Sequence, residues 1–402
     1  MFAEPQIKKP APTTPSQTTR PLKERMDSRR LRVGVIGWGD VAQVVHLPTL
    51  QLLTHLYDTV AVCDVSAKTA AHCASVFHIP IATTDPQVLF DTPSIDVILI
   101  LTSDEYHAPY AVAALHAGKH VMVEKPLTLS LASGREIIAA EDAAPNGARV
   151  FVGYMRRYAA SLETFQREIS TIPCIHYARV RDIIGPNAYF ISQSGASPKK
   201  FFDDIPSSAS ADRNRRLQNL LEEAWGLPFD RLSENKKDYC CLLANLGSHG
   251  LSLMRECLGG LPDAVVASRV SGKWYTTMFD YRNRKGGGQP FTCLYETGID
   301  NVPRFDSHVA VYGENKSVTI RYDTPFIKGL GITVEVDEMN EHGEKVHYSV
   351  QSGYEDAYTR ELKELYACIV KKKDFKTTAS DALEDLKLFK MMLEKYPAEN
   401  DG

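Results

Sequence analysis

LRVGVIGWGDVA, residues 31–42, joins a short apolar run to a glycine-rich turn. The run 31–36 is rich in β-branched residues, which favours a buried strand. In the GxGxxA turn, Gly37 permits a tight strand-to-helix turn, Gly39 lets the backbone approach a pyrophosphate, and Ala42 allows close packing of the helix. The helix N-terminus offers free N–H groups to phosphates. The stretch therefore predicts a dinucleotide-binding turn, whose contacting residues are Gly37, Trp38, Gly39, Asp40 and Val41.

An acidic residue follows the next apolar run. The run 60–63 ends at Asp64, which lies 22 residues beyond Ala42, close to where such folds place the acid that binds the adenosine ribose. A carboxylate there would accept hydrogen bonds from the ribose hydroxyls and repel a 2′-phosphate. The position predicts NAD as the cofactor, while the nearby Lys68 keeps NADP possible.

Strands and helices continue to alternate. We expect a helix over 66–77, a strand over 95–101, a helix over 108–117 and a strand over 120–123. This alternation predicts a doubly wound parallel sheet, in which ligands bind beyond the carboxyl ends of the strands. Thr102 and Glu124 would then lie beside the glycine turn. Lys125 would lie there too, where an ammonium could donate to a substrate oxygen or transfer a proton; from position alone, a solvated lysine is the alternative.

Composition limits the class of protein. A chain of 402 residues with 44% hydrophobic and 24% charged residues predicts two folded domains. The net charge of −4 does not favour nucleic-acid binding, and no apolar run is long enough for a membrane span. Eight scattered cysteines without a CxxC pair suggest a reducing, cytoplasmic setting and no metal site. Residues 1–30 hold few large apolar side chains, so we expect a disordered tail.

The motifs resemble one family. GWGDVA at 37–42, Asp64 and TSDEYHAPYAVAALHAGKHVMVEKPL at 102–127 resemble the glucose–fructose oxidoreductase, inositol dehydrogenase and rhizopine catabolism (Gfo/Idh/MocA) family. The resemblance implies a Rossmann domain at 31–150 and an α+β domain at 151–402. The second domain would carry a largely antiparallel open sheet, through which a homodimer or homotetramer would form. Strand-like runs lie at 174–184, 264–271, 291–298, 306–313 and 316–322, and helical runs at 354–371 and 380–394.

The resemblance also implies a catalytic pair. It raises Lys125 to a catalytic candidate and matches Asn245–Ser252, NLGSHGLS, to the family pattern D-x-G-x-H-x-x-D. His249 stands at the histidine position and is an acid–base candidate, although a helix-contact role is the alternative. Asn245 replaces the first acid, so it can hydrogen-bond but carries no charge. His107 matches a histidine near the cofactor, and Asp104 replaces an asparagine of the family.

Other candidates concern the substrate. Arg156, Arg157 and Tyr158 are candidates to line the pocket, with a solvated face as the alternative, and Asn187 is a candidate for which a turn role is the alternative. The excursion 193–237, with a helical piece near 215–225, is either a substrate lid or a solvated insertion.

These features predict an NAD(P)-dependent oxidoreductase. It would transfer a hydride between nicotinamide and a hydroxyl-bearing carbon of a small molecule, by resemblance a sugar, polyol or related cyclic alcohol. One alternative is a reductase of a non-sugar carbonyl, enone or imine, which the change at Asn245 favours. Another is a non-catalytic, dinucleotide-sensing regulator, which loss of Lys125 or His249 would favour; both residues are present.

Overall fold

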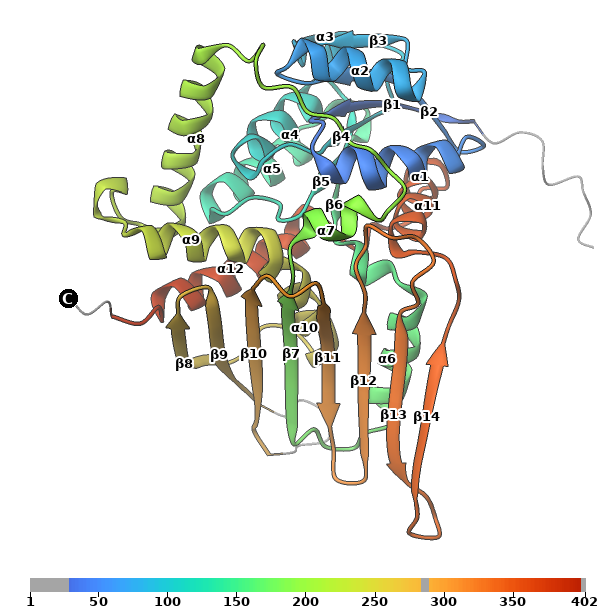
Figure 1. The fold of residues 1–402 in the computed structure, drawn as a ribbon, viewed down its shortest axis with the longest axis vertical. Helices are drawn as coiled ribbons and strands as arrows, with labels where there is room; N and C mark the ends of the chain where they lie inside the picture. Colours follow the sequence, from blue (N-terminus) through green and yellow to red (C-terminus); the bar gives the residue numbers. More distant parts are fainter. Residues whose placement is uncertain (1–28, 283–288, 399–402) are drawn as a thin grey trace, which may run out of the picture.

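Two sheets organise the chain, which a computed structural model describes over residues 29–282 and 289–398 (Figure 1). The first sheet has six parallel strands in the order β3-β2-β1-β4-β5-β6. Its strands are β1 (Leu31–Ile36), β2 (Tyr57–Cys63), β3 (Ile81–Thr83), β4 (Val97–Ile100), β5 (His120–Glu124) and β6 (Val150–Gly153). β4 and β6 are buried along their whole length, as expected for a sheet covered on both faces.

Helices cover both faces of this sheet. One face packs against α4 (His107–His116) and α5 (Leu131–Asp142), through side chains such as Leu115 and Ile137. The other packs against α1 (Leu47–Leu52) and α2 (Ala67–Phe77). α11 (Ala357–Val370) returns from the end of the chain to the same face, where Leu362 and Leu365 are fully buried. The predicted doubly wound sheet is confirmed.

The second sheet has eight strands in the order β14-β13-β12-β11-β7-β10-β9-β8, and only the pair β7–β10 is parallel. The strands are β7 (Tyr177–Ile184), β8 (Ala264–Ser271), β9 (Trp274–Tyr281), β10 (Phe291–Ile299), β11 (Phe305–Tyr312), β12 (Lys316–Tyr322), β13 (Thr333–Met339) and β14 (Lys345–Gln351). The predicted antiparallel sheet is confirmed, although β9, β13 and β14 were not expected.

Helices gather on one face of the second sheet. They are α6 (Ala160–Ser170), α10 (Ser248–Leu258) and α12 (Ala379–Glu394), which bury one large core with the sheet. Burial alternates along β7, so its second face is only partly covered. α12 also contacts the first sheet region, where Ala379 and Ala382 are buried. The two sheets are thus joined through the last helices.

The start of the folded region differs slightly from the prediction. Residues 1–28 of the expected tail lie outside the described residues. The Arg29 guanidinium pairs with Asp96, and the Tyr366 hydroxyl donates to the Arg29 carbonyl at 2.9 Å. The described fold therefore includes Arg29, two residues ahead of the predicted boundary at Leu31. Within residues 29–282 and 289–398, no helix has the length and apolar character needed to cross a membrane.

Candidate active site

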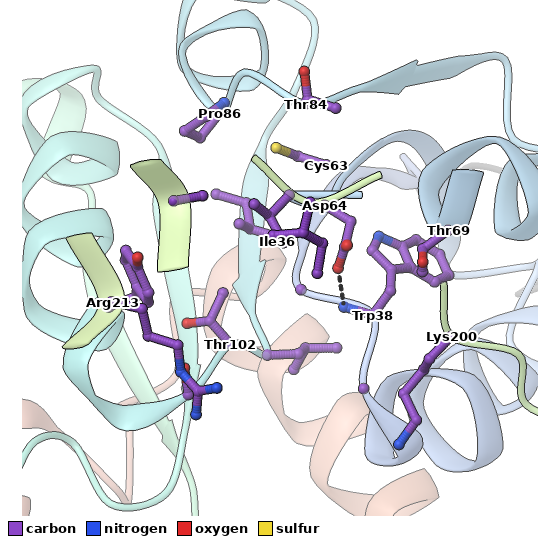
Figure 2. A pocket seen from close by; sticks show the side chains of 18 of the residues that line it. Ile36, Trp38, Cys63, Asp64, Thr69, Thr84, Pro86, Thr102, Lys200 and Arg213 are labelled. Carbon is purple, nitrogen blue, oxygen red and sulfur yellow. Dashed lines mark hydrogen bonds between the residues drawn. The ribbon is translucent and has the colours of Figure 1, made fainter. Parts of the chain in front are cut away.

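A cavity of about 840 Å³ opens at the carboxyl ends of β1, β2 and β4 (Figure 2). The glycine turn and Asp64 form one wall, and Lys200 and Arg213, from the excursion predicted at 193–237, lie on opposite sides of it. Its size is within the range of small-molecule and cofactor pockets. The cavity is therefore shared between the first domain and a segment of the second.

The glycine turn has the expected backbone. Gly37 adopts φ +93°, and a Cβ there would lie 2.8 Å from the Leu101 carbonyl oxygen, so only glycine fits. A Cβ built on Gly39 meets nothing within 4 Å, which leaves open space above this peptide. The Trp38 side chain is buried and its ring lies 6.3 Å from that of Phe77, so Trp38 offers the cavity mainly its backbone. The open turn fits a pyrophosphate.

Asp64 directly follows β2, and backbone groups fix its carboxylate. One oxygen accepts from the Trp38 amide at 3.1 Å and the other from the Ser66 amide at 2.9 Å, the first of which is drawn in Figure 2. Burial raises the pKa of Asp64, and these two hydrogen bonds oppose the rise. The carboxylate lines the cavity, where a ribose would meet it.

A second hollow of about 560 Å³ adjoins the first. Its lining includes Lys125, Arg156 and His249, together with Asn187 and Asn245. The two hollows share part of their walls, namely Leu101, Thr102, Ser103 and Arg213. A ligand in the first can therefore extend toward Lys125 and His249 in the second.

Lys125 directly follows β5 and reaches the helix that leads to α10. Its Nζ donates to the Asn245 carbonyl at 2.9 Å, with the Ala244 carbonyl at 3.4 Å. Burial lowers the pKa of Lys125, whereas the charges of Glu124 and Asp104 oppose this effect. Asn245 thus serves the lysine through its main chain, whereas the family acid would act through its side chain.

Glu124 points to a different partner. Its carboxylate lies 2.7 Å from His46 Nε2 and also accepts from the Lys125 amide at 3.1 Å. Burial by itself raises the pKa of Glu124, but the contact with His46 outweighs it and the pKa is lowered. An ionised Glu124 therefore fixes the backbone at Lys125, and its negative charge favours the protonated form of the Lys125 side chain.

His249 lies one residue into α10, after the π-helical turn Leu243–Gly247. Burial lowers its pKa well below 6.5, and the charges of Lys125 and Arg156 act in the same direction. Its Nδ1 is buried and has no hydrogen-bond partner among the described residues. The imidazole is therefore neutral near pH 7 and can accept a proton.

Two residues after β4 complete this wall. His107 Nδ1 lies 2.8 Å from the Pro126 carbonyl and Nε2 lies 3.1 Å from the Thr102 carbonyl, so His107 braces the two loops. Asp104 lines the second hollow. Burial raises its pKa, and His107 and Lys125 oppose the rise. Asp104, which departs from the family pattern, therefore contributes an acid beside Lys125.

The side chains of the three candidate residues at 156–158 contact different parts of the molecule. Arg156 lines the second hollow and donates to Asp182 at 2.7 Å. Arg157 instead pairs with Glu256 and Asp381, which join α10 to α12. The Tyr158 hydroxyl lies 2.8 Å from Thr377 Oγ1, and its ring stacks on Phe151. Arg157 and Tyr158 line neither hollow, so we do not retain them as substrate contacts.

Part of the excursion predicted at 193–237 forms a strap, defined here as residues 199–216, along the first hollow. After α7 (Asn187–Ser192), the chain crosses the first domain and enters α8 (Ser207–Trp225), so the strap includes the first half of α8 (Figure 1). α8 then leads to α9 (Glu234–Leu242). The Lys199 amide donates to Gln43 Oε1 at 2.9 Å and Arg213 donates to Glu105 at 2.8 Å. Lys200 pairs with Asp40 of the glycine turn. The strap covers the first hollow, which is the nucleotide side rather than the substrate side.

Comparison with known proteins agrees with this geometry. Residues 31–154 match the model of the oxidoreductase family with an NAD-binding Rossmann fold. This N-terminal domain belongs to the Gfo/Idh/MocA oxidoreductase family. The resemblance of the family motifs is confirmed, and the domain is an NAD-binding Rossmann domain.

Relatives extend the comparison. The chain is 37% identical over 130 residues to an inositol 2-dehydrogenase of Salmonella paratyphi B, covering 32% of this chain and 38% of that one. It is 34% identical over 115 residues to scyllo-inositol 2-dehydrogenase (NAD(+)) of Bacillus subtilis, covering 28% and 33%. The matched stretch thus spans about a third of these relatives. An aldose-aldose oxidoreductase of Caulobacter crescentus shares the fold, with a TM-score of 0.67, 17% identity and coverage of 91% and 97%.

Proposed function

We propose that this protein is an NAD-dependent dehydrogenase. It would transfer a hydride between nicotinamide and a hydroxyl-bearing carbon of a sugar, polyol or related cyclic alcohol. The observation that carries the proposal is the shared wall of the two hollows, because it brings Lys125 and His249 to the end of the nucleotide cavity. The names of the two inositol dehydrogenases support the substrate class, and (NAD(+)) in one supports the cofactor.

The cofactor would lie along the first hollow. The Gly37 to Gly39 backbone would receive the pyrophosphate, and Asp64 would accept from the ribose hydroxyls. When bound, nicotinamide supplies the hydride acceptor for oxidation or the donor for reduction. Leu101, Thr102 and Ser103 would border the end nearest the second hollow.

Lys125 and His249 would divide the proton work. The Lys125 ammonium, held by the Asn245 carbonyl, would donate a hydrogen bond to the substrate oxygen. Neutral His249 would accept the hydroxyl proton as the carbon loses its hydride, and would return a proton in the reverse direction. The positive charges of Lys125 and Arg156 disfavour protonation of His249, so the imidazole stays neutral and can act as a base.

Assembly and location are further proposals. The partly covered face of the second sheet includes the exposed side chains Trp274 and Met278. We take this face as the surface through which two or four copies would associate. Six cysteines, namely Cys63, Cys73, Cys240, Cys241, Cys293 and Cys368, are free thiols, which suits a reducing compartment such as the cytoplasm.

A nucleotide assay tests the proposal. The full chain would be incubated with NAD or NADP and a panel of inositols, aldoses and other polyols, and reduced nicotinamide would be followed by absorbance. The expected result is turnover of at least one polyol with NAD. Saturable NAD binding without turnover of any compound in the panel, and without NADH oxidation by a ketone or imine in a reverse assay, would instead support the regulatory alternative.

A further inference from the structure

The insertion strap places two acidic residues against the first turn of α2, beside Asp64. One oxygen of Asp204 accepts from the Ser66 hydroxyl at 2.6 Å, and the other accepts from the Lys68 amide at 2.9 Å. The Asp203 carboxylate pairs with the Lys68 ammonium. These contacts join residues about 135 positions apart in the chain. The donors at the start of α2 are thus occupied by the protein's own carboxylates.

Those donors form an anion-binding set. Ser66 is the N-cap of α2, and its hydroxyl oxygen accepts a hydrogen bond from the Thr69 amide at 3.0 Å. The same hydroxyl donates a hydrogen bond to Asp204. The Lys68 amide belongs to the first helical turn, where the N–H groups and the helix dipole favour negative charge. The hydrogen bonds from Ser66 and then from the Lys68 amide lower the pKa of Asp204, so this residue is an anion near neutral pH.

The same donors lie beside the ribose end of the first hollow. Asp64 accepts from the Ser66 amide at 2.9 Å, and the strap side chains Phe202 and Ile205 line the cavity with it. If Asp64 receives the ribose hydroxyls, Ser66 and Lys68 are the donors placed to meet a phosphate on the 2′ position. Without the strap acids, the negative charge and the oxygens of a phosphate would satisfy the Ser66 and Lys68 donors.

We propose that Asp203 and Asp204 of the strap select against NADP by occupying the hydroxyl, amide and ammonium groups that would bind its 2′-phosphate. This inference rests on the proposed function. It assigns cofactor selection to two sites, because Asp64 repels the phosphate from the ribose side and the strap removes its partners. Lys68, which from sequence alone kept NADP possible, is neutralised by the second domain.

The strap is also held by contacts that do not involve these acids. The Phe201 amide donates to Thr69 Oγ1 at 3.1 Å, and the Lys199 amide and carbonyl both bond to Gln43 at 2.9 Å. Removing the two carboxylates should therefore leave the strap in place. The variant D203A/D204A then opens the donor set without removing Asp64.

The test is to measure Kd for NADH and NADPH by titration calorimetry on the full chain. Wild type should prefer NADH. In D203A/D204A, Kd for NADPH should fall roughly tenfold to a hundredfold, the scale of hydrogen bonds to a charged group. Kd for NADH should stay within about twofold. Adding Lys68→Ala should cancel part of the gain, because the Ser66 hydroxyl and the backbone amide of residue 68 remain; adding Ser66→Ala as well should cancel most of it. Asp230→Ala, which removes an exposed acid from the same excursion, should change neither Kd.

The outcomes separate the two proposals. Wild type that binds neither nucleotide would overturn the proposed function, and this inference with it. Wild type that binds NADH, with a ratio of the two Kd values unchanged in D203A/D204A, would overturn only the role of the strap. A gain that survives the combined removal of the Ser66 hydroxyl and the Lys68 ammonium would also overturn it. If the alanine variant fails to fold, D203N/D204N removes the charges with little change in shape, and the ratio should shift in the same direction by a smaller factor.

Discussion

The two hollows that meet beside β4 are built in different ways. The nucleotide cavity takes its main groups from a contiguous stretch, because Gly37, Gly39 and Asp64 belong to one β-α-β unit. The glycines contribute their backbone, and backbone amides hold the Asp64 carboxylate. The second hollow takes Lys125, Arg156 and His249 from three distant segments. The first resembles a local motif, whereas the second exists only in the folded chain. We infer that binding and chemistry can be disturbed separately.

Their electrostatic character differs as well. Asp64 gives the ribose end of the first hollow an acidic wall, and Asp203 and Asp204 cover the donors at the start of α2 next to it. The second hollow places Lys125 and Arg156 near a neutral imidazole. An acidic wall suits hydroxyl groups, and a cationic wall suits an oxygen that gains negative charge. The contrast predicts that variants of the second hollow change turnover more than nucleotide affinity.

The largest expected effect follows from removing the ammonium. Lys125→Met keeps most of the bulk of the side chain, and should lower kcat by roughly two to four orders of magnitude. Steady-state kinetics with the substrate found in the panel would measure it. Lys395→Met, an exposed lysine after α12, is the matched control and should retain wild-type kcat. A Lys125→Met enzyme that is folded and turns over near the wild-type rate would remove Lys125 from the mechanism.

The adjacent arginines sharpen the distinction between chemistry and structure. Arg157 is about 5% exposed and pairs with Glu256 and Asp381. Arg157→Met removes a buried guanidinium, whereas Glu256 keeps Lys376 and Asp381 keeps Arg255, so it should lower the free energy of unfolding by about 1–3 kcal/mol. Urea unfolding would measure this loss, with the exposed Arg231→Met as control. Equal stability with a lost kcat would instead place Arg157 in the reaction.

The pH dependence of oxidation tests the neutral imidazole. The pKa of His249 is well below the usual 6.5, because burial and then the charges of Lys125 and Arg156 disfavour its protonation. As pH falls through 6.5, His249 stays unprotonated, so kcat/KM should hold there and decline only at lower pH. A pH–rate profile, with folding checked by circular dichroism at each pH, would show it. A decline centred at or above pH 6.5 would argue against His249 as the base.

The smallest effect is expected at Asn245. Lys125 bonds to its carbonyl, and the side chain is exposed. Asn245→Ala keeps that carbonyl, so kcat should stay within about twofold of wild type, the range of a surface substitution. The comparison with Lys125→Met in the same assay is the measurement. A loss as large as that of Lys125→Met would show that the amide side chain itself works in the site.

Sequence reasoning reached the parts of the site whose geometry is local. The GxGxxA turn and the acid after β2 have fixed positions in a β-α-β unit, so Gly37 and Asp64 could be placed from spacing alone. The strand order also brought Lys125 to the same edge of the sheet, because β4 and β5 are neighbours. Resemblance to the family was needed to bring His249 to it.

The remaining features depend on contacts between distant residues. Arg156 and Arg157 are adjacent in a 3₁₀ turn, and only the packed partners Asp182 and Asp381 show which one faces the hollow. The strap has no local motif, because a role for its two acids becomes visible only from their contacts with Ser66 and Lys68 in the folded chain. β14 is an edge strand with exposed residues along it, so pairing with β13 rather than burial fixes it.

The most direct test of separate binding and chemistry compares Kd for NADH in two variants. Titration calorimetry would be applied to Asp64→Ala and Lys125→Met. Asp64→Ala should raise Kd roughly tenfold to a hundredfold, because a charged acceptor for the ribose is lost. Lys125→Met should leave Kd within about twofold of wild type. A large rise in Kd for Lys125→Met together with an unchanged Kd for Asp64→Ala would contradict the division of the two hollows.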